Sequence, residues 1–140
     1  MIIEADPPSG FPSSWYVAFF GSERRHWWDY LSPGGFYHVL AFAYAASAER
    51  WLIYDVTEHR TIIRAYTTDD FSKWIAGLPN GRTILRFDGG DRPAAPHVRW
   101  GFWCAPAVAH LVGVRSRALR PVALWRDLLA QGAHPAFMEP

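Results

Sequence analysis

The chain has 140 residues, half of them apolar and 16% aromatic, and its formal net charge is +1. This length fits one domain with a sizeable core, and the apolar content excludes a disordered chain. The small net charge gives no general attraction to nucleic acid, so we expect no nucleic-acid partner. A single cysteine excludes an intrachain disulfide and a cysteine-rich zinc site, and the composition indicates no cofactor.

The N-terminal sequence contains no recognisable export signal. It reads MIIEADPP, without a basic stretch followed by an apolar run. The longest apolar stretch, Val39 to Ala46, is far shorter than the roughly 20 residues of a membrane span. We therefore expect synthesis in the cytoplasm and no membrane span, while association with a virion would leave no mark in the sequence.

The first half of the chain predicts an irregular arm, a short helix and an antiparallel meander. Residues 1–13 are rich in Pro, Ser and Gly, which is typical of an irregular segment. Ser22 followed by Glu23 predicts a helix that continues to about Leu31. Runs of aromatic and β-branched residues predict strands at Trp15 to Phe20, Phe36 to Tyr44, Trp51 to Val56 and Thr61 to Tyr66.

Phe36 to Tyr44 is the clearest of these strands, and both of its faces are largely apolar, as in a central strand. Because side chains alternate along a strand, one face is predicted to carry Phe36, His38, Leu40, Phe42 and Tyr44. The other face is predicted to carry Tyr37, Val39, Ala41 and Ala43.

The second half predicts one more strand and three helices. Thr67 to Asp70 is typical of a helix start, and Gly77 to Gly81 of a helix end. The predicted elements are a helix from about Asp70 to Ala76, a strand from Arg82 to Phe87, a surface loop from Asp88 to Arg99, a helix beginning at or just after Cys104 and stopping at Gly113, a helix from Pro121 to about Ala130, and a tail over residues 131–140. The pattern predicts a single α+β domain over residues 1–140, with helices packed on an antiparallel sheet of about four to five strands.

Cys104 is the most informative residue of the sequence. Pro106 is tolerated only in the first turn of a helix, and the spacing of the apolar residues after it is helical. Cys104 is therefore predicted at a helix N-terminus, where unpaired backbone N–H groups and the helix dipole favour an anion. A thiol there is activated as a nucleophile. The competing interpretation is a buried cysteine that acts as a small apolar residue.

His38 and Asp55 are predicted to lie near each other in a hairpin. If its turn centres near Ser47 and Ala48, Tyr44 faces Trp51, and His38 and Asp55 are diagonal neighbours on one face, about 7–8 Å apart at the backbone. A thiolate, an imidazole and a carboxylate form a nucleophilic site when they meet. The alternatives are a core histidine for His38 and a turn-bonding carboxylate for Asp55.

The order of these segments resembles a known family. The segments are GFYH (Gly35 to His38), WLIYD (Trp51 to Asp55), Cys104 to Gly113, and Pro121 to Leu128. They resemble circularly permuted papain-like cysteine hydrolases of the NlpC and lecithin–retinol acyltransferase type. The chain is also similar to small phage and prophage proteins, and the likeness extends over residues 15–130.

The resemblance implies a permuted papain-like half-barrel and a set of roles. Cys104 would be the nucleophile, His38 the general base and Asp55 the residue that orients it, with His59 or Thr61 as alternatives for that third role. The implied reaction is hydrolysis of an amide or peptide bond, with a peptide or a peptidoglycan-like substrate as partner. The alternative is a non-catalytic virion or tail module that keeps the fold and binds other virion proteins.

The eight tryptophans allow two further interpretations. Trp100 and Trp103 flank Cys104, and Trp51 shares a predicted strand face with Asp55. Such side chains can line a substrate groove or form a protein–protein surface. His97, Cys104 and His110 are too scattered for a zinc pattern, so we predict no metal site.

Overall fold

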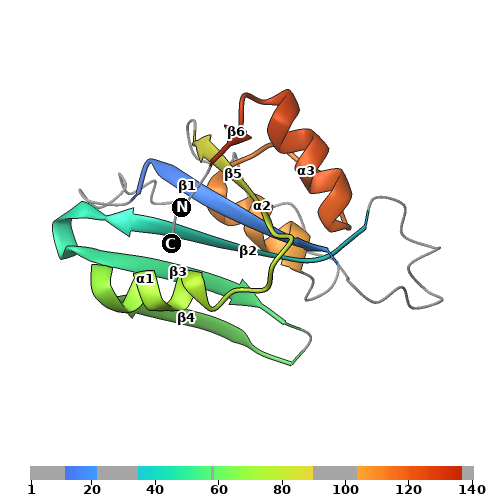
Figure 1. Cartoon of the computed structure of the whole chain (residues 1–140). Coiled ribbons are helices and arrows are strands. Elements are labelled where there is room, and N and C mark those ends of the chain that lie inside the picture. The colour runs from blue at the N-terminus through green and yellow to red at the C-terminus, as the bar shows by residue number, and fades with distance from the viewer. Residues whose placement is uncertain (1–11, 22–34, 58, 90–103, 137–140) are drawn as a thin grey trace.

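The computed structural model describes residues 12–21, 35–57, 59–89 and 104–136, which form an α+β fold with a six-stranded antiparallel sheet and three α-helices (Figure 1). The strands are β1 (Ser14–Gly21), β2 (Phe36–Ala45), β3 (Arg50–Val56), β4 (Thr61–Tyr66), β5 (Thr83–Asp88) and β6 (His134–Pro135). The α-helices are α1 (Thr68–Ala76), α2 (Cys104–Val112) and α3 (Pro121–Ala130), and a 3-10 helix, η2, spans Ala46–Ala48.

The strands lie in the order β4-β3-β2-β1-β5-β6, and every neighbouring pair is antiparallel. The five longer strands agree with the sequence-based expectation. The sixth differs, because β6 lies in the segment expected to be a C-terminal tail and pairs Pro135 with Leu85. The helix predicted from Ser22 to Leu31, most of the predicted loop from Asp88 to Arg99, and Trp100 and Trp103 lie outside the described residues.

Helices cover both faces of the sheet (Figure 1). We call the two sides the α2–α3 face and the α1 face. The core of the α2–α3 face includes Phe19, Val39, Ala41, Val108 and Leu124. The core of the α1 face includes Phe20, Leu40, Phe42, Phe71 and Ile75. Because β1 and β2 contribute alternate residues to both cores, they are central strands, as the apolar pattern of Phe36 to Tyr44 predicts.

Helix α1 has the N-cap that its sequence predicts. The Thr67 hydroxyl oxygen accepts a hydrogen bond from the Asp70 N–H at 3.2 Å. Phe71 and Ile75 lie one turn apart and are buried against the sheet, and the Phe71 ring stacks on Trp51 at 4.0 Å between centroids. Trp51 is therefore a packing residue of the α1 face. The other tryptophans in the described ranges also pack in or against the two cores, namely Trp15, Trp74 and Trp125.

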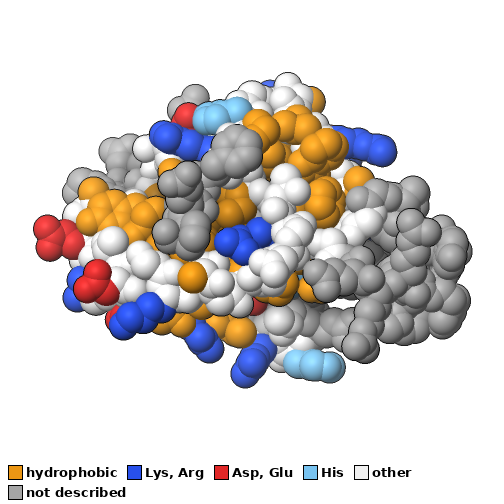
Figure 2. Space-filling model, in the orientation of Figure 1, with side chains coloured by type: hydrophobic (Ala, Val, Ile, Leu, Met, Phe, Trp, Pro, Cys, Tyr) orange, Lys and Arg blue, Asp and Glu red, His pale blue; other side chains and the backbone are white. Residues whose placement is uncertain are grey.

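The outer edge of the sheet carries charged side chains. Arg64 on edge strand β4 and Lys73 on α1 are exposed, and Figure 2 shows Lys and Arg side chains along this margin of the molecule. Ile63, the neighbour of Arg64 on β4, is 72% exposed. Charged residues on an edge strand disfavour pairing with a second chain.

A β-bulge in β2 corrects the face assignment made from the sequence. Phe20 pairs with His38, but the next β1 residue, Gly21, pairs with Phe36, so Tyr37 is an additional residue without a β1 partner. Because of this additional residue, the side chains of β2 before the bulge point to the opposite face from the one that strict alternation predicts. Phe36 therefore packs on the α2–α3 face, against Phe19 at 5.3 Å between ring centroids, and does not share the face of His38 as predicted. Tyr37 is 56% exposed.

The C-terminal end of α2 approaches the backbone of Gly89 very closely. A Cβ atom on Gly89 would lie 2.9 Å from the Val112 carbonyl oxygen, and the Gly89 N–H donates to the Ser13 carbonyl at 2.8 Å. The end of α2 is thus held where β1 begins and β5 ends. Nine helical residues extend roughly 13 Å, so the first residue of α2 lies toward the opposite end of these strands, where β1 pairs with His38.

This close approach predicts that Gly89→Ala destabilises the fold by roughly 1–3 kcal/mol, since either the helix or the strand end must shift. Urea unfolding measures the change. Gly77→Ala is the matched control, because its Cβ would meet backbone atoms only at 3.5 and 3.6 Å and its φ is −81°. We expect that control to be neutral or to stabilise by up to about 1 kcal/mol. Equal effects of the two substitutions would contradict the steric argument.

Candidate active site

The candidate site lies where β2 and β3 separate. Their pairing runs from Ala45 with Arg50 to Ala41 with Tyr54 and includes the predicted pair of Tyr44 with Trp51. In the described residues it stops there, although β3 continues to Val56 in its pairing with β4 and β2 begins at Phe36. At this end of the sheet, side chains rather than backbone hydrogen bonds connect the two strands.

The connection is a hydrogen bond between His38 and Asp55. Nε2 of His38 lies 2.7 Å from Oδ1 of Asp55, and the two side chains are 22% and 21% exposed. His38 also lies against the Phe20 ring, at 6.1 Å between centroids. The carboxylate therefore fixes the orientation of a partly buried imidazole, with a proton on Nε2.

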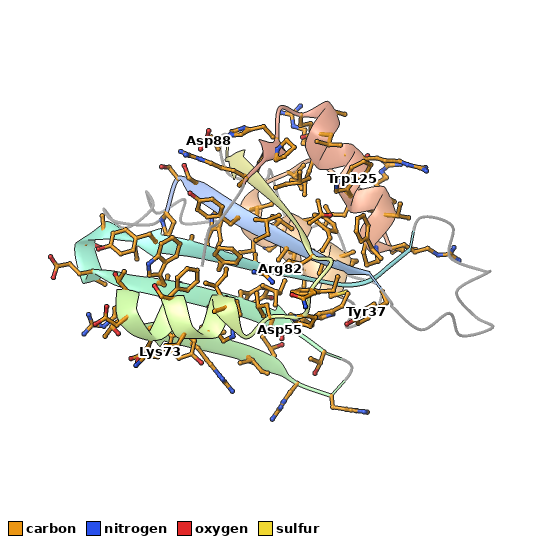
Figure 3. The ribbon with its side chains drawn as sticks, viewed as in Figure 1. Tyr37, Asp55, Lys73, Arg82, Asp88 and Trp125 are labelled. Carbon is orange, nitrogen blue, oxygen red and sulfur yellow. The ribbon has the colours of Figure 1, made fainter. Side chains whose placement is uncertain are left out.

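Cys104, the first residue of α2, lies close enough to the same imidazole to raise its pKa by hydrogen bonding and by charge. Because Nε2 binds Asp55, the ring atom left for the sulfur is Nδ1. The sulfur comes from a helix on the α2–α3 face, whereas His38 lies on the α1 face by its register with Phe20. A side-chain contact cannot pass through a hydrogen-bonded sheet, so this one is made at the end of β2, where β2 and β3 no longer pair. Figure 3 shows Asp55 and Tyr37 near this end of the sheet.

The surroundings of His38 favour its protonated form. Burial of the ring has the largest single effect and lowers its pKa. The hydrogen bonds to Asp55 and Cys104, together with the attraction of both side chains, outweigh burial and raise the pKa of His38 from 6.5 to about 9. At neutral pH the site is therefore an imidazolium held between a carboxylate and a sulfur.

The structure brings together Cys104, His38 and Asp55, the three residues singled out from the sequence. His59, the first alternative for the third role, is exposed in the turn after β3, and Thr61 is exposed at the start of β4. Asp55 is the side chain that contacts the imidazole. The catalytic roles of the three residues stay predictions, because proximity alone does not demonstrate turnover.

Two features of this end of the sheet were not predicted from the sequence. They are the separation of β2 from β3 and the position of Arg82 relative to His38. Arg82 directly precedes β5, whose pairing with β1 ends at Thr83 with Phe19. Continued by one residue, this register would place Arg82 opposite Phe20 on the α1 face. Only the pairing of β5 with β1 reveals this position, since the two strands are more than 60 residues apart in the sequence.

Within the described ranges, no cluster of His, Cys, Asp and Glu could hold a metal ion, and no helix is long and apolar enough to cross a membrane.

The electrostatics predict that Asp55→Asn lowers the pKa of His38, because it removes an attractive charge and weakens the hydrogen bond that counteract burial. Histidine proton resonances followed by NMR should give a midpoint near 9 for His38 in the natural protein and a clearly lower one in the variant. An unchanged midpoint for His38 would show that Asp55 does not control its protonation.

The same shift predicts a pH-dependent stability. A group whose pKa is raised in the folded state stabilises the fold fully below the unfolded value, here 6.5, and that stabilisation is lost as pH rises through about 9. The free energy of unfolding, measured with urea, should therefore fall more from pH 6.5 to 9 in the natural protein than in Asp55→Asn, by roughly 1–2 kcal/mol. Parallel profiles would contradict this assignment, since all other titrating groups are common to both proteins.

No protein-family model, curated protein or solved structure matches this chain. Its function is therefore inferred from the chemistry of Cys104, His38 and Asp55 and from the order of its segments.

Proposed function

We propose that the protein is a cysteine-nucleophile hydrolase that cleaves an amide or peptide bond. The observation that carries this proposal is the contact of one imidazole with both Asp55, at 2.7 Å, and Cys104. A nucleophile, a base and a residue that orients the base are the minimal set for covalent acyl transfer. A partly buried histidine held as a cation is costly for a purely structural core, and such perturbed groups concentrate at functional sites.

In the first half of the proposed reaction, the Cys104 thiolate attacks the substrate carbonyl carbon. The new C–S bond forms as the carbonyl π electrons move to oxygen, giving a tetrahedral oxyanion. The oxyanion then collapses and the C–N bond breaks. His38, protonated at Nδ1, transfers that proton to the departing amine, which leaves neutral. The products are a free amine, a thioester on Cys104 and a neutral imidazole.

In the second half, the neutral imidazole accepts a proton from water, and the oxygen of that water attacks the thioester carbonyl. Collapse of the second tetrahedral oxyanion breaks the C–S bond and restores the thiolate and the imidazolium. Throughout, Asp55 accepts the Nε2–H hydrogen bond, which keeps Nδ1 directed at the sulfur. Backbone N–H groups in the first turn of α2 suit the oxyanion, although Pro106 contributes none.

The fold and substrate class belong to the same proposal. An antiparallel sheet with the nucleophile at the start of a packed helix supports the likeness to permuted papain-like hydrolases, whose substrates imply a peptide or peptidoglycan-like bond here. Synthesis in the cytoplasm and association with a phage virion remain part of that proposal.

A non-catalytic module that keeps the same fold is the second candidate. Among the described residues, large apolar side chains are exposed on separate parts of the molecule, at Tyr37, Tyr44, Ile63 and Leu119. Each is a single exposed side chain of a type that occurs in protein–protein contacts, such as those that virion or tail components would make. This candidate requires no activated thiol, so one reactivity measurement separates the two functions.

The hydrolase proposal predicts that iodoacetamide alkylates Cys104 roughly 10–100-fold faster at pH 6.5 than a free cysteine, whose pKa of about 8.5 leaves only about 1% thiolate at that pH. His38→Ala should reduce the rate to that of a free thiol. The reaction is followed by intact-protein mass, which needs no substrate.

His59→Ala is the matched control, because it removes an exposed histidine four residues from Asp55 and should leave the alkylation rate unchanged. Cys104→Ala should abolish labelling and keep the circular dichroism spectrum. A natural protein that reacts no faster than a free thiol, with a rate indifferent to His38→Ala, would favour the non-catalytic module.

A further inference from the structure

We propose that Arg82 binds a carboxylate of the substrate beside the bond that is cleaved, so that the site selects anionic substrates. This inference rests on the proposed function of Cys104. It begins with the orientation of the guanidinium group. Nη1 donates to the carbonyl oxygens of Leu78 at 3.2 Å and Pro79 at 3.3 Å. These two bonds use both hydrogens of Nη1.

The two carbonyls hold the guanidinium in place and, as far as the described part of the chain goes, do not engage its Nε–Nη2 edge. No described residue is hydrogen-bonded to that edge or forms an ion pair with Arg82. Two parallel N–H groups match the two oxygens of a carboxylate, which makes this edge the preferred one for bidentate binding. Because the side chain is already ordered by backbone contacts and is partly buried, binding a carboxylate costs it little additional side-chain entropy.

Arg86 on β5, four residues after Arg82, is an arginine whose Nε–Nη2 edge does have partners. Its Nε donates to Asp88 at 3.1 Å and its Nη2 contacts the Ser14 hydroxyl at 3.4 Å. Arg82 and Arg86 are four residues apart and lie on the same face of the sheet, since both have even offsets from Ile84 of the α1-face core. The chain thus supplies an anionic partner to one arginine and no described partner to the other.

The position of Arg82 relative to the catalytic residues supports a substrate contact. Arg82 comes directly before Thr83, which pairs with Phe19, so the β1–β5 register continued by one residue brings Arg82 opposite Phe20. Phe20 pairs with His38 on the other side of β1. Two inter-strand spacings therefore separate the backbones of Arg82 and His38, roughly 10 Å. Figure 3 places Arg82 and Asp55 in the same region of the molecule. One or two substrate residues span this distance.

A pair of small reagents that differ in charge tests the proposal. Iodoacetate and iodoacetamide alkylate Cys104 through the same step, and only iodoacetate carries a carboxylate. The quantity measured is the rate constant for iodoacetate divided by the rate constant for iodoacetamide. In Arg82→Gln we expect this ratio to fall roughly three- to tenfold, because an attractive charge near the sulfur is lost. The rate with iodoacetamide should stay within twofold of the natural protein.

Arg86→Gln is the matched control, because it makes the same charge change in the same segment of chain, four residues or roughly 13 Å from Arg82. It should leave the ratio unchanged. A ratio that is unchanged in Arg82→Gln, or that falls equally in both variants, overturns the role of Arg82. Slow reaction of the natural protein with both reagents and indifference to His38→Ala would instead reject the hydrolase proposal itself.

Two isomeric compounds that could protect Cys104 from alkylation distinguish a backbone carboxylate from a side-chain carboxylate. They are N-acetylglutamine and the α-amide of N-acetylglutamic acid. The first carries its carboxylate on the backbone and the second on the side chain. Protection of Cys104 from iodoacetamide by one isomer identifies the source, and this protection should be lost in Arg82→Gln. Equal protection in the natural protein and Arg82→Gln would also count against carboxylate binding by Arg82.

Discussion

The contact on which the rest of the site depends is the hydrogen bond between His38 and Asp55. It joins β2 to β3 just beyond the point where their backbone pairing ends. The attraction outweighs the cost of burying the imidazolium, so the pair contributes to stability below about pH 9. It also provides orientation. With Nε2 bound to a carboxylate, the imidazole presents Nδ1 to Cys104 and remains protonated at neutral pH.

Two separate constraints bring the sulfur to this imidazole. At its C-terminal end, α2 packs so closely on Gly89 that a side chain there would collide with the Val112 carbonyl. Along its length, Ala105, Val108 and Ala109 are buried against β2 and its neighbours. Small residues on this face of the helix let it lie close to the sheet. Cys104, the proposed nucleophile, therefore belongs to a packed helix rather than to a loop, as accurate positioning requires.

The alternation of apolar residues along strands and the capping residues at helix starts predicted much of the fold. The Thr67 cap, the central character of β2 and the pairing of Tyr44 with Trp51 all follow from residues close together in the sequence. The face of Phe36 could not be predicted, because the bulge at Tyr37 arises from the pairing of β2 with β1 and leaves no mark in the alternation of β2 itself. The pairing of β6 with β5 was also missed, since a two-residue strand carries too little pattern to be recognised.

For the candidate site, the sequence by itself determined the chemical types available and their local settings: one thiol at the start of a helix, and a histidine and an aspartate on adjacent strands. These follow from short-range rules of helix capping and strand alternation. Only the tertiary structure decided that Asp55, rather than His59 or Thr61, contacts His38, that Cys104 reaches the same ring, and that Arg82 lies two strands away. Such contacts depend on strand register and on where β2 and β3 separate, and both are set by packing among segments far apart in the chain.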